Sequence, residues 1–156
     1  MNRKGKAYNC LLLAILALIL FVQFRYRPQW IITVGPSMTP TVINGDVVLG
    51  LANTNLDRGD KIVFERGSDW LLKRIVGMPG EHIRVVRGML FINGKYTRED
   101  YVTFNDERFE FVCQLGPDEF FVMGDNRPNS SDSRHVGPVK RSRILYEVKM
   151  RVGAFR

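Results

Sequence analysis

Hydrophobic and polar residues divide the chain into one long apolar stretch near its start and a series of short runs after it. The long stretch, Cys10 to Phe24, reads CLLLAILALILFVQF and is uncharged, with basic residues just outside both ends. It predicts a membrane-contacting helix, which residues 7–9 can extend toward the roughly 20 residues that span a bilayer. No small-x-small cleavage site follows, so we expect a retained anchor and not a secretory signal that is removed.

The short runs alternate or are apolar, and Gly, Pro, Asn and Asp separate them, which is typical of strands. Hairpin turns are predicted at Arg87-Gly88 and Asn93-Gly94, and another turn at Pro79-Gly80. No amphipathic run of helical period occurs outside the apolar stretch. The predicted fold class is therefore mainly β, with small coiled antiparallel sheets preceded by one N-terminal transmembrane helix. Strands are expected within residues 31–34, 46–52, 61–66, 70–76, 82–94, 110–115, 119–124 and 144–153.

Charge is distributed unevenly along the 156 residues, which have room for one globular domain. The net charge is +7, but five basic residues and no acidic one lie within residues 1–27. The rest is nearly neutral, which removes the main support for nucleic-acid binding. The more basic early flank favours a cytoplasmic N-terminus. We expect a basic cytoplasmic segment over 1–9, a signal-anchor helix and flank over 10–27, and an extracytoplasmic β-rich domain over 28–156.

The two cysteines, Cys10 and Cys113, lie in the apolar stretch and deep in the following domain, so a disulfide between them is not expected. The chain has no CxxC pair and no cluster of Cys and His that would give zinc a ligand set. The sequence therefore predicts neither a metal nor a cofactor.

A small nucleophile lies in GPSMTPT, residues 35–41, directly after a β-like run. Pro36 and Pro40 restrict the chain on both sides of Ser37, and Gly35 allows other backbone to approach closely. Such a rigid turn can present a hydroxyl for attack, and it can equally be an ordinary turn at the end of a strand. A catalytic serine would also need a base.

Lysine and histidine are the candidates for that base. In a strand over 70–76, Lys73 projects between aliphatic neighbours, where burial would lower its pKa toward neutrality, whereas the Arg74 guanidinium stays protonated. His82 and His135 lie in contexts more typical of surface or packed residues. A triad of His135 with Asp125 or Asp132 nevertheless stays open.

A polar segment, MGDNRPNSSDSRHVGPV over residues 123–139, is dense in hydroxyls, amides and acids. By composition it is a flexible or solvated loop. Alternatively, it folds back to the serine and lysine and holds their geometry through hydrogen bonds.

These segments, in this order, resemble the type I signal peptidase family of Ser/Lys proteases. Four boxes carry the resemblance, SMTPT at 37–41, RGD at 58–60, KRIVGMPGE at 73–81 and GDNRPNSSDSRHVGPV at 124–139. The likeness runs from about Trp30 to Ile144.

The resemblance implies a nucleophile, Ser37, a general base, Lys73, and a hydrogen bond from Ser130 to that lysine. The Ser37 backbone N–H would be one oxyanion donor. Some members add a serine hydroxyl where this chain has Gly35, so the second donor is left unassigned.

The resemblance further implies two ion pairs that brace the site, Asp125 with Arg74 and Asp132 with Arg134. His135 falls where the family usually has an aromatic or aliphatic residue, which indicates a packing role.

Substrates implied by the family are exported precursor proteins with N-terminal signal peptides and small residues at the first and third positions before the cleavage site. They would bind as an extended strand beside residues 32–36 and the strand of Lys73. We expect a monomeric, single-pass enzyme of the cytoplasmic membrane that needs no cofactor and binds no nucleic acid. The alternatives are a mitochondrial inner-membrane, pilin or conjugation peptidase, a self-cleaving repressor, or a non-catalytic membrane-tethered β binding module.

Overall fold

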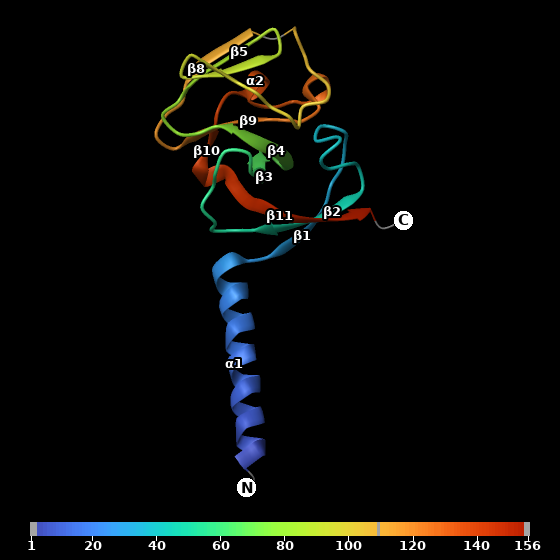
Figure 1. Ribbon diagram of the computed structural model, residues 1–156, viewed down its shortest axis with the longest axis vertical. Helices are drawn as coiled ribbons and strands as arrows, with labels where there is room; N and C mark the ends of the chain where they lie inside the picture. Colours follow the sequence, from blue (N-terminus) through green and yellow to red (C-terminus); the bar gives the residue numbers. More distant parts are fainter. Residues whose placement is uncertain (1–2, 109, 155–156) are drawn as a thin grey trace.

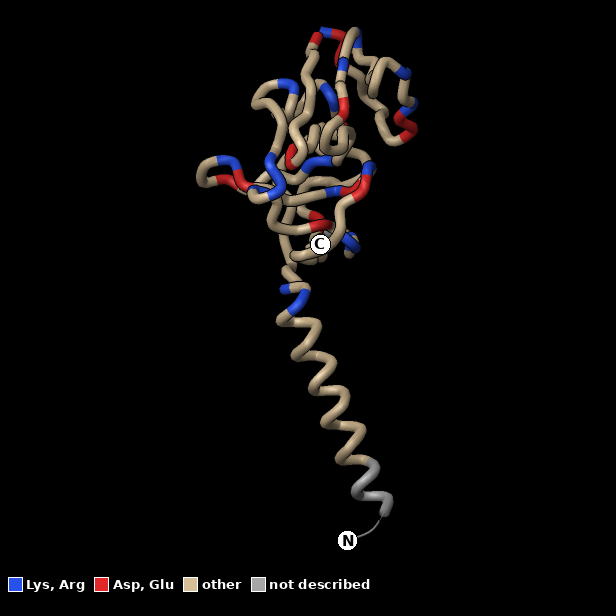
Figure 2. Tube along the Cα trace, turned by 90° about the vertical axis from the view of Figure 1, so that its left-hand side faces the viewer, with Lys and Arg blue, Asp and Glu red and all other residues tan. Residues whose placement is uncertain are grey.

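The computed structural model describes residues 3–108 and 110–154, in which a long helix extends from a β-rich domain (Figure 1). The helix, α1, runs over Arg3–Tyr26 and so begins before the predicted apolar stretch. Its segment Tyr8–Tyr26 is long and apolar enough to cross a membrane, and the rest of the chain buries none of it. Within Tyr8–Tyr26 charge is confined to the end next to the domain (Figure 2). The predicted orientation rests on basic side chains within residues 1–7, which lie outside the described side chains.

Eleven strands form the domain among the described residues, and each predicted run overlaps at least one. The unpredicted strands β7 and β10 are three and two residues long, too short to give a hydrophobic pattern. The strands are β1 Gln29–Ile32, β2 Asp46–Leu51, β3 Lys61–Arg66, β4 Asp69–Gly77, β5 His82–Val86, β6 Met89–Ile92, β7 Lys95–Thr97, β8 Glu110–Gln114, β9 Glu119–Met123, β10 Val139–Lys140 and β11 Ile144–Ala154.

Two antiparallel sheets result, which confirms the predicted mainly β class. The larger has the order β1-β2-β11-β3-β4-β9-β10, and the smaller has the order β7-β6-β5-β8. The smaller sheet lies at the end of the domain remote from α1 (Figure 1). Both predicted hairpins are present, because Arg87, Gly88, Asn93 and Gly94 all have the positive φ that two-residue primed turns require.

The helix is joined to the larger sheet through the loop that follows β2. The Ala52 N–H donates to the Tyr26 carbonyl at 2.6 Å, and Arg25 Nη1 donates to the Asn53 carbonyl at 2.8 Å. Asn53 Nδ2 returns a bond to the Arg25 carbonyl at 3.1 Å. These contacts hold the end of α1 against the larger sheet, and β1 begins three residues later.

The polar segment over residues 123–139 folds back onto the serine turn, where the Asn126 N–H donates to the Ser37 carbonyl, so of its two interpretations the solvated loop is wrong. It contains a 3-10 helix, η1, at Arg127–Asn129 and a short α-helix, α2, at Ser133–Val136. Asp132 caps α2 by accepting from the Arg134 N–H, and both Asp132 and Ser133 are 0% exposed. Composition alone gave the wrong prediction because these polar groups form hydrogen bonds with one another inside the protein instead of with water. A second 3-10 helix, η2, at Arg141–Arg143, leads into β11.

Three apolar clusters fill the domain, and two of them lie under the residues discussed below. Met38, 3% exposed, packs with Val48 and Val63 beneath the turn that carries Ser37. Ile75 packs with Ile62 in a second cluster next to Lys73 on β4. The serine turn and the lysine strand are therefore each seated on buried side chains, which limits their movement.

Candidate active site

The turn that carries Ser37 is held by the polar segment as well as by the core. The Asn126 N–H donates to the Ser37 carbonyl at 3.0 Å, and Asn126 Nδ2 donates to the Pro36 carbonyl at 3.2 Å. Within the turn, the Thr39 N–H donates to the same Pro36 carbonyl at 3.1 Å. The Ser37 backbone N–H has no hydrogen-bond partner within the described chain, so it is available to a ligand.

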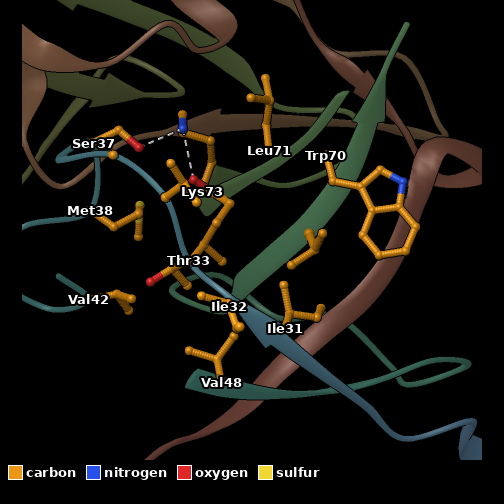
Figure 3. A pocket seen from close by; sticks show the side chains of 14 residues that line it. Ile31, Ile32, Thr33, Ser37, Met38, Val42, Val48, Trp70, Leu71 and Lys73 are labelled. Carbon is orange, nitrogen blue, oxygen red and sulfur yellow. Dashed lines mark hydrogen bonds between the residues drawn. The ribbon is translucent and has the colours of Figure 1, made fainter. Parts of the chain in front are cut away.

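Lys73 reaches Ser37 from β4, where it stands opposite Ile62 of β3. Its amine donates to Ser37 Oγ at 2.9 Å and to the Leu72 carbonyl at 2.8 Å (Figure 3). The side chain is buried, and burial lowers the pKa of Lys73 to about 8. At that value a useful fraction is neutral near physiological pH, so the amine can accept the serine proton.

Ser130 is placed differently from the expectation. Its hydroxyl donates to Asp132 Oδ2 at 2.7 Å, whereas the hydrogen bonds of Lys73 go to Ser37 and to the Leu72 carbonyl. Ser130 nevertheless lies beside the serine turn, because a Cβ added to Gly124 would lie 2.3 Å from Ser130 Oγ and 2.5 Å from the Ser37 carbonyl oxygen. A residue without a side chain is what lets the two serines approach this closely.

Asp132 accepts hydrogen bonds from several residues of the polar segment and pairs with Arg134, as expected. Arg134 Nε and Nη2 donate to its two oxygens, each at 2.9 Å, and the Gly124 N–H adds a bond at 3.0 Å. Burial alone would raise the pKa of Asp132, but these donors lower it overall. The Asp132 carboxylate is therefore charged at neutral pH, and it orients Ser130 by accepting the hydrogen bond that the serine hydroxyl donates.

The second expected ion pair, Arg74 with Asp125, is also present. Arg74 Nη2 and Nε donate to the two carboxylate oxygens at 2.6 and 2.8 Å, with Asp125 0% exposed. Arg74 Nη1 also donates to the Gly59 carbonyl at 2.7 Å, which links the RGD box to the strand of Lys73. The pair thus holds the start of the polar segment against β4.

Three residues of this assembly escaped the sequence reasoning. The Tyr101 ring centroid lies 4.1 Å from the Arg74 guanidinium carbon, and the Tyr101 hydroxyl donates to Glu99 Oε1 at 2.5 Å. Arg127 Nη2 donates to the same Glu99 oxygen at 2.7 Å. Glu99 and Tyr101 could not be found from pattern, because they lie in an irregular segment between β7 and β8, whereas Arg127 lies in the box at 124–139 but had no role assigned to it.

Neither histidine forms a triad. Ser37 Oγ bonds Lys73, whereas His135 Nδ1 accepts from the Asp132 N–H at 3.4 Å and caps α2. The packing role expected for His135 is therefore replaced by a capping role, with the side chain about one third exposed. His82 begins β5 in the smaller sheet.

A groove of about 260 Å³ leads to Ser37 and Lys73 (Figure 3). Residues 31–35 form one side, residues 70–73 form the other, and its base includes Met38, Val42 and Val48. Among the described strands β1 pairs only with β2, so its outer edge can accept a further extended strand. The Gly35 N–H donates to Asn44 Oδ1 at 2.9 Å and is not free to act as an oxyanion donor. The groove and the open strand edge thus suit an extended chain.

Comparisons with known proteins agree with this geometry. Residues 5–153 match the family model described as signal peptidase, peptidase S26. The chain is 32% identical over 147 residues to signal peptidase I P of Bacillus subtilis subsp. natto, covering 84% of this chain and 76% of that protein. It is 33% identical over 158 residues to signal peptidase I T of Bacillus subtilis (strain 168), covering 90% and 79%. A crystal structure of a signal peptidase I from Enterococcus faecalis V583 superposes with a TM-score of 0.53 at 29% identity, covering 66% of this chain and 98% of that one.

Proposed function

The chain belongs to the signal peptidase family, peptidase S26, and from this premise we propose that Ser37 is its nucleophile and Lys73 its general base. Like the signal peptidases I that it matches, it is a serine endopeptidase that acts on secreted precursor proteins with signal peptides. The observation that carries the residue assignment is the 2.9 Å contact between a buried lysine amine and a serine hydroxyl at the end of a groove.

In the proposed reaction, neutral Lys73 takes the Ser37 proton as Oγ attacks the scissile carbonyl. The unpartnered Ser37 N–H donates to the oxyanion that forms. Lys73 then gives the proton to the leaving amine, and a water molecule deprotonated by Lys73 hydrolyses the acyl-enzyme. Burial supports this cycle, because it keeps the amine uncharged often enough to act as a base.

We propose that Ser130 helps to position the site through its hydrogen bond to Asp132, and not through a direct hydrogen bond to Lys73. Asp132 accepts from Ser130 and from the Gly124 N–H, so the serine hydroxyl and the turn around Gly124 are positioned together. The Arg74 to Asp125 and Arg134 to Asp132 pairs hold the segment in place. None of these residues is assigned a proton transfer.

The proposed substrate is a precursor whose small side chains enter the groove beside residues 32–35 while its backbone extends β1. A monomeric enzyme remains part of the proposal. The family is membrane-bound, and we propose that α1 spans the membrane with residues 1–9 in the cytoplasm and the domain over 28–156 outside. Protease added to right-side-out vesicles should then digest the domain, and digestion only in inverted vesicles would contradict this orientation.

The test of the dyad is cleavage, in lipid or detergent, of a precursor with an Ala-x-Ala site. Ser37→Ala and Lys73→Ala are each expected to reduce cleavage to background, while His82→Ala and His135→Ala keep most of it. Trapping of an acyl group on Ser37 would identify the nucleophile. Full activity of Lys73→Ala would refute the dyad, and loss in His135→Ala with retention in Lys73→Ala would point to a triad.

A further inference from the structure

Arg66 lies at the end of β3, on the hairpin whose second strand carries Lys73. Its backbone pairs with Asp69 across the turn, and its Nη1 donates to Ser131 Oγ at 2.8 Å. Ser131 lies in the polar segment, directly after Ser130. One exposed hydrogen bond therefore joins the lysine hairpin to the segment that holds the second serine, from two positions 65 residues apart in sequence.

The charge of Arg66 also acts on Lys73. The charged groups that influence the Lys73 amine are Asp132 and Asp125 from the polar segment and Arg66 from β3. The two carboxylates favour the protonated amine, whereas the guanidinium disfavours it. Arg66 is thus the one member of this set that assists burial in keeping Lys73 neutral.

The position of this charge depends on its hydrogen bond. A free arginine at a hairpin end extends into water, where salt and solvent screen its field over about 8 to 10 Å. Arg66 is only half-buried, and Ser131 is exposed. The bond to Ser131 is what holds the guanidinium against the segment beside the base.

We propose that Arg66 is a positioning residue of the Ser37 and Lys73 site, which ties the Ser130 to Asp132 segment to the lysine hairpin and holds a permanent positive charge against that segment. This inference rests on the proposed function, since it takes Lys73 as the base. Arg66 touches neither substrate nor reacting atoms in this role. Its effect reaches the reaction through the charge state of Lys73 and the placement of the segment.

Four variants of the full-length enzyme separate the charge from the tether. Arg66→Gln removes the charge but keeps a hydrogen-bond donor, Arg66→Lys keeps the charge, and Ser131→Ala removes the acceptor. Arg143→Gln is the matched control, because Arg143 bonds the Glu65 carbonyl at the same strand end and is not among the charges acting on Lys73. Each variant is assayed for kcat and KM against pH with one precursor, and its thermal unfolding midpoint is recorded.

We expect Arg66→Gln to lower kcat/KM about two- to fivefold at neutral pH and to approach the wild type at alkaline pH, since loss of a nearby positive charge favours protonated lysine. Arg66→Lys should stay nearer the wild type, Ser131→Ala should shift the acid limb in the same direction by less, and Arg143→Gln should match the wild type. A pH profile of Arg66→Gln that coincides with that of Arg143→Gln would overturn the proposal. A pH-independent loss would overturn the electrostatic part, and Lys73→Ala measured alongside shows separately whether the dyad itself fails.

Discussion

Gly124 provides a severe test of the site because it separates the two serines without contributing a functional group. A Cβ at this position would lie 2.3 Å from Ser130 Oγ, 2.6 Å from Ser130 Cβ and 2.5 Å from the Ser37 carbonyl oxygen. Ordinary contacts of a Cβ begin near 3.4 Å, so Gly124→Ala must displace one of the serines by roughly 1 Å. No unusual backbone angle adds to this, since Gly124 is not among the glycines with positive φ.

We expect Gly124→Ala to lower kcat about 100-fold, because a displacement of this size takes the nucleophile out of line with its base. Overpacking of a buried site should lower the free energy of unfolding by about 1–3 kcal/mol, which leaves the domain folded. The measurements are kcat and KM for precursor cleavage and unfolding followed by circular dichroism. A large loss of kcat with a folded protein is the expected combination.

The control is Gly116→Ala, where the added Cβ would meet only the Glu119 side chain, at 3.2 Å. That flexible carboxylate can move, so cleavage should stay close to the wild-type rate. If Gly124→Ala cleaves within about twofold of Gly116→Ala, the close packing of Ser37 and Ser130 around this glycine is not required, and the reasoning fails.

Two further predictions concern the base and its support. For Lys73, whose pKa is lowered to about 8, the active form is the neutral amine. We therefore expect kcat/KM to rise with pH, with a midpoint near pH 8, and to level off roughly one unit above it; an acid limb that is lost in His135→Ala would contradict this. Tyr101→Leu removes the ring that covers Arg74, and we expect it to lower the free energy of unfolding by about 1–2 kcal/mol and kcat severalfold. Tyr101→Phe keeps the ring and should lower both quantities less. Equal effects of the two variants on unfolding and on kcat would show that the contact with Arg74 is unimportant.

The strands were predictable because each buried face imposes a period of two on its own segment. Hairpin turns at Arg87-Gly88 and Asn93-Gly94 were predictable for the same local reason, since few residues tolerate positive φ. The order of the strands within each sheet was not predictable from the sequence. β11 lies between β2 and β3, a position that depends on pairing between segments far apart in the chain.

The polar segment illustrates the opposite case, in which local information pointed the wrong way. Its composition is that of a loop in water, yet Asp132 is buried and bonds Ser130 and Arg134. Whether such groups are solvated or paired inside the protein depends on what surrounds them, which a single segment does not specify. The expected bond of Ser130 to Lys73 was replaced by the bond to Asp132 for the same reason.

The sequence by itself determined the apolar helix, most of the strands, the rigid serine turn and the choice of lysine over arginine as a candidate base, because each depends on neighbouring residues. The tertiary structure decided that Ser37 and Lys73, 36 residues apart, lie 2.9 Å from each other. It also decided that Arg66 and Tyr101 belong to the surroundings of the site. Such contacts follow from sheet register and core packing, which are properties of the whole chain and not of any one segment.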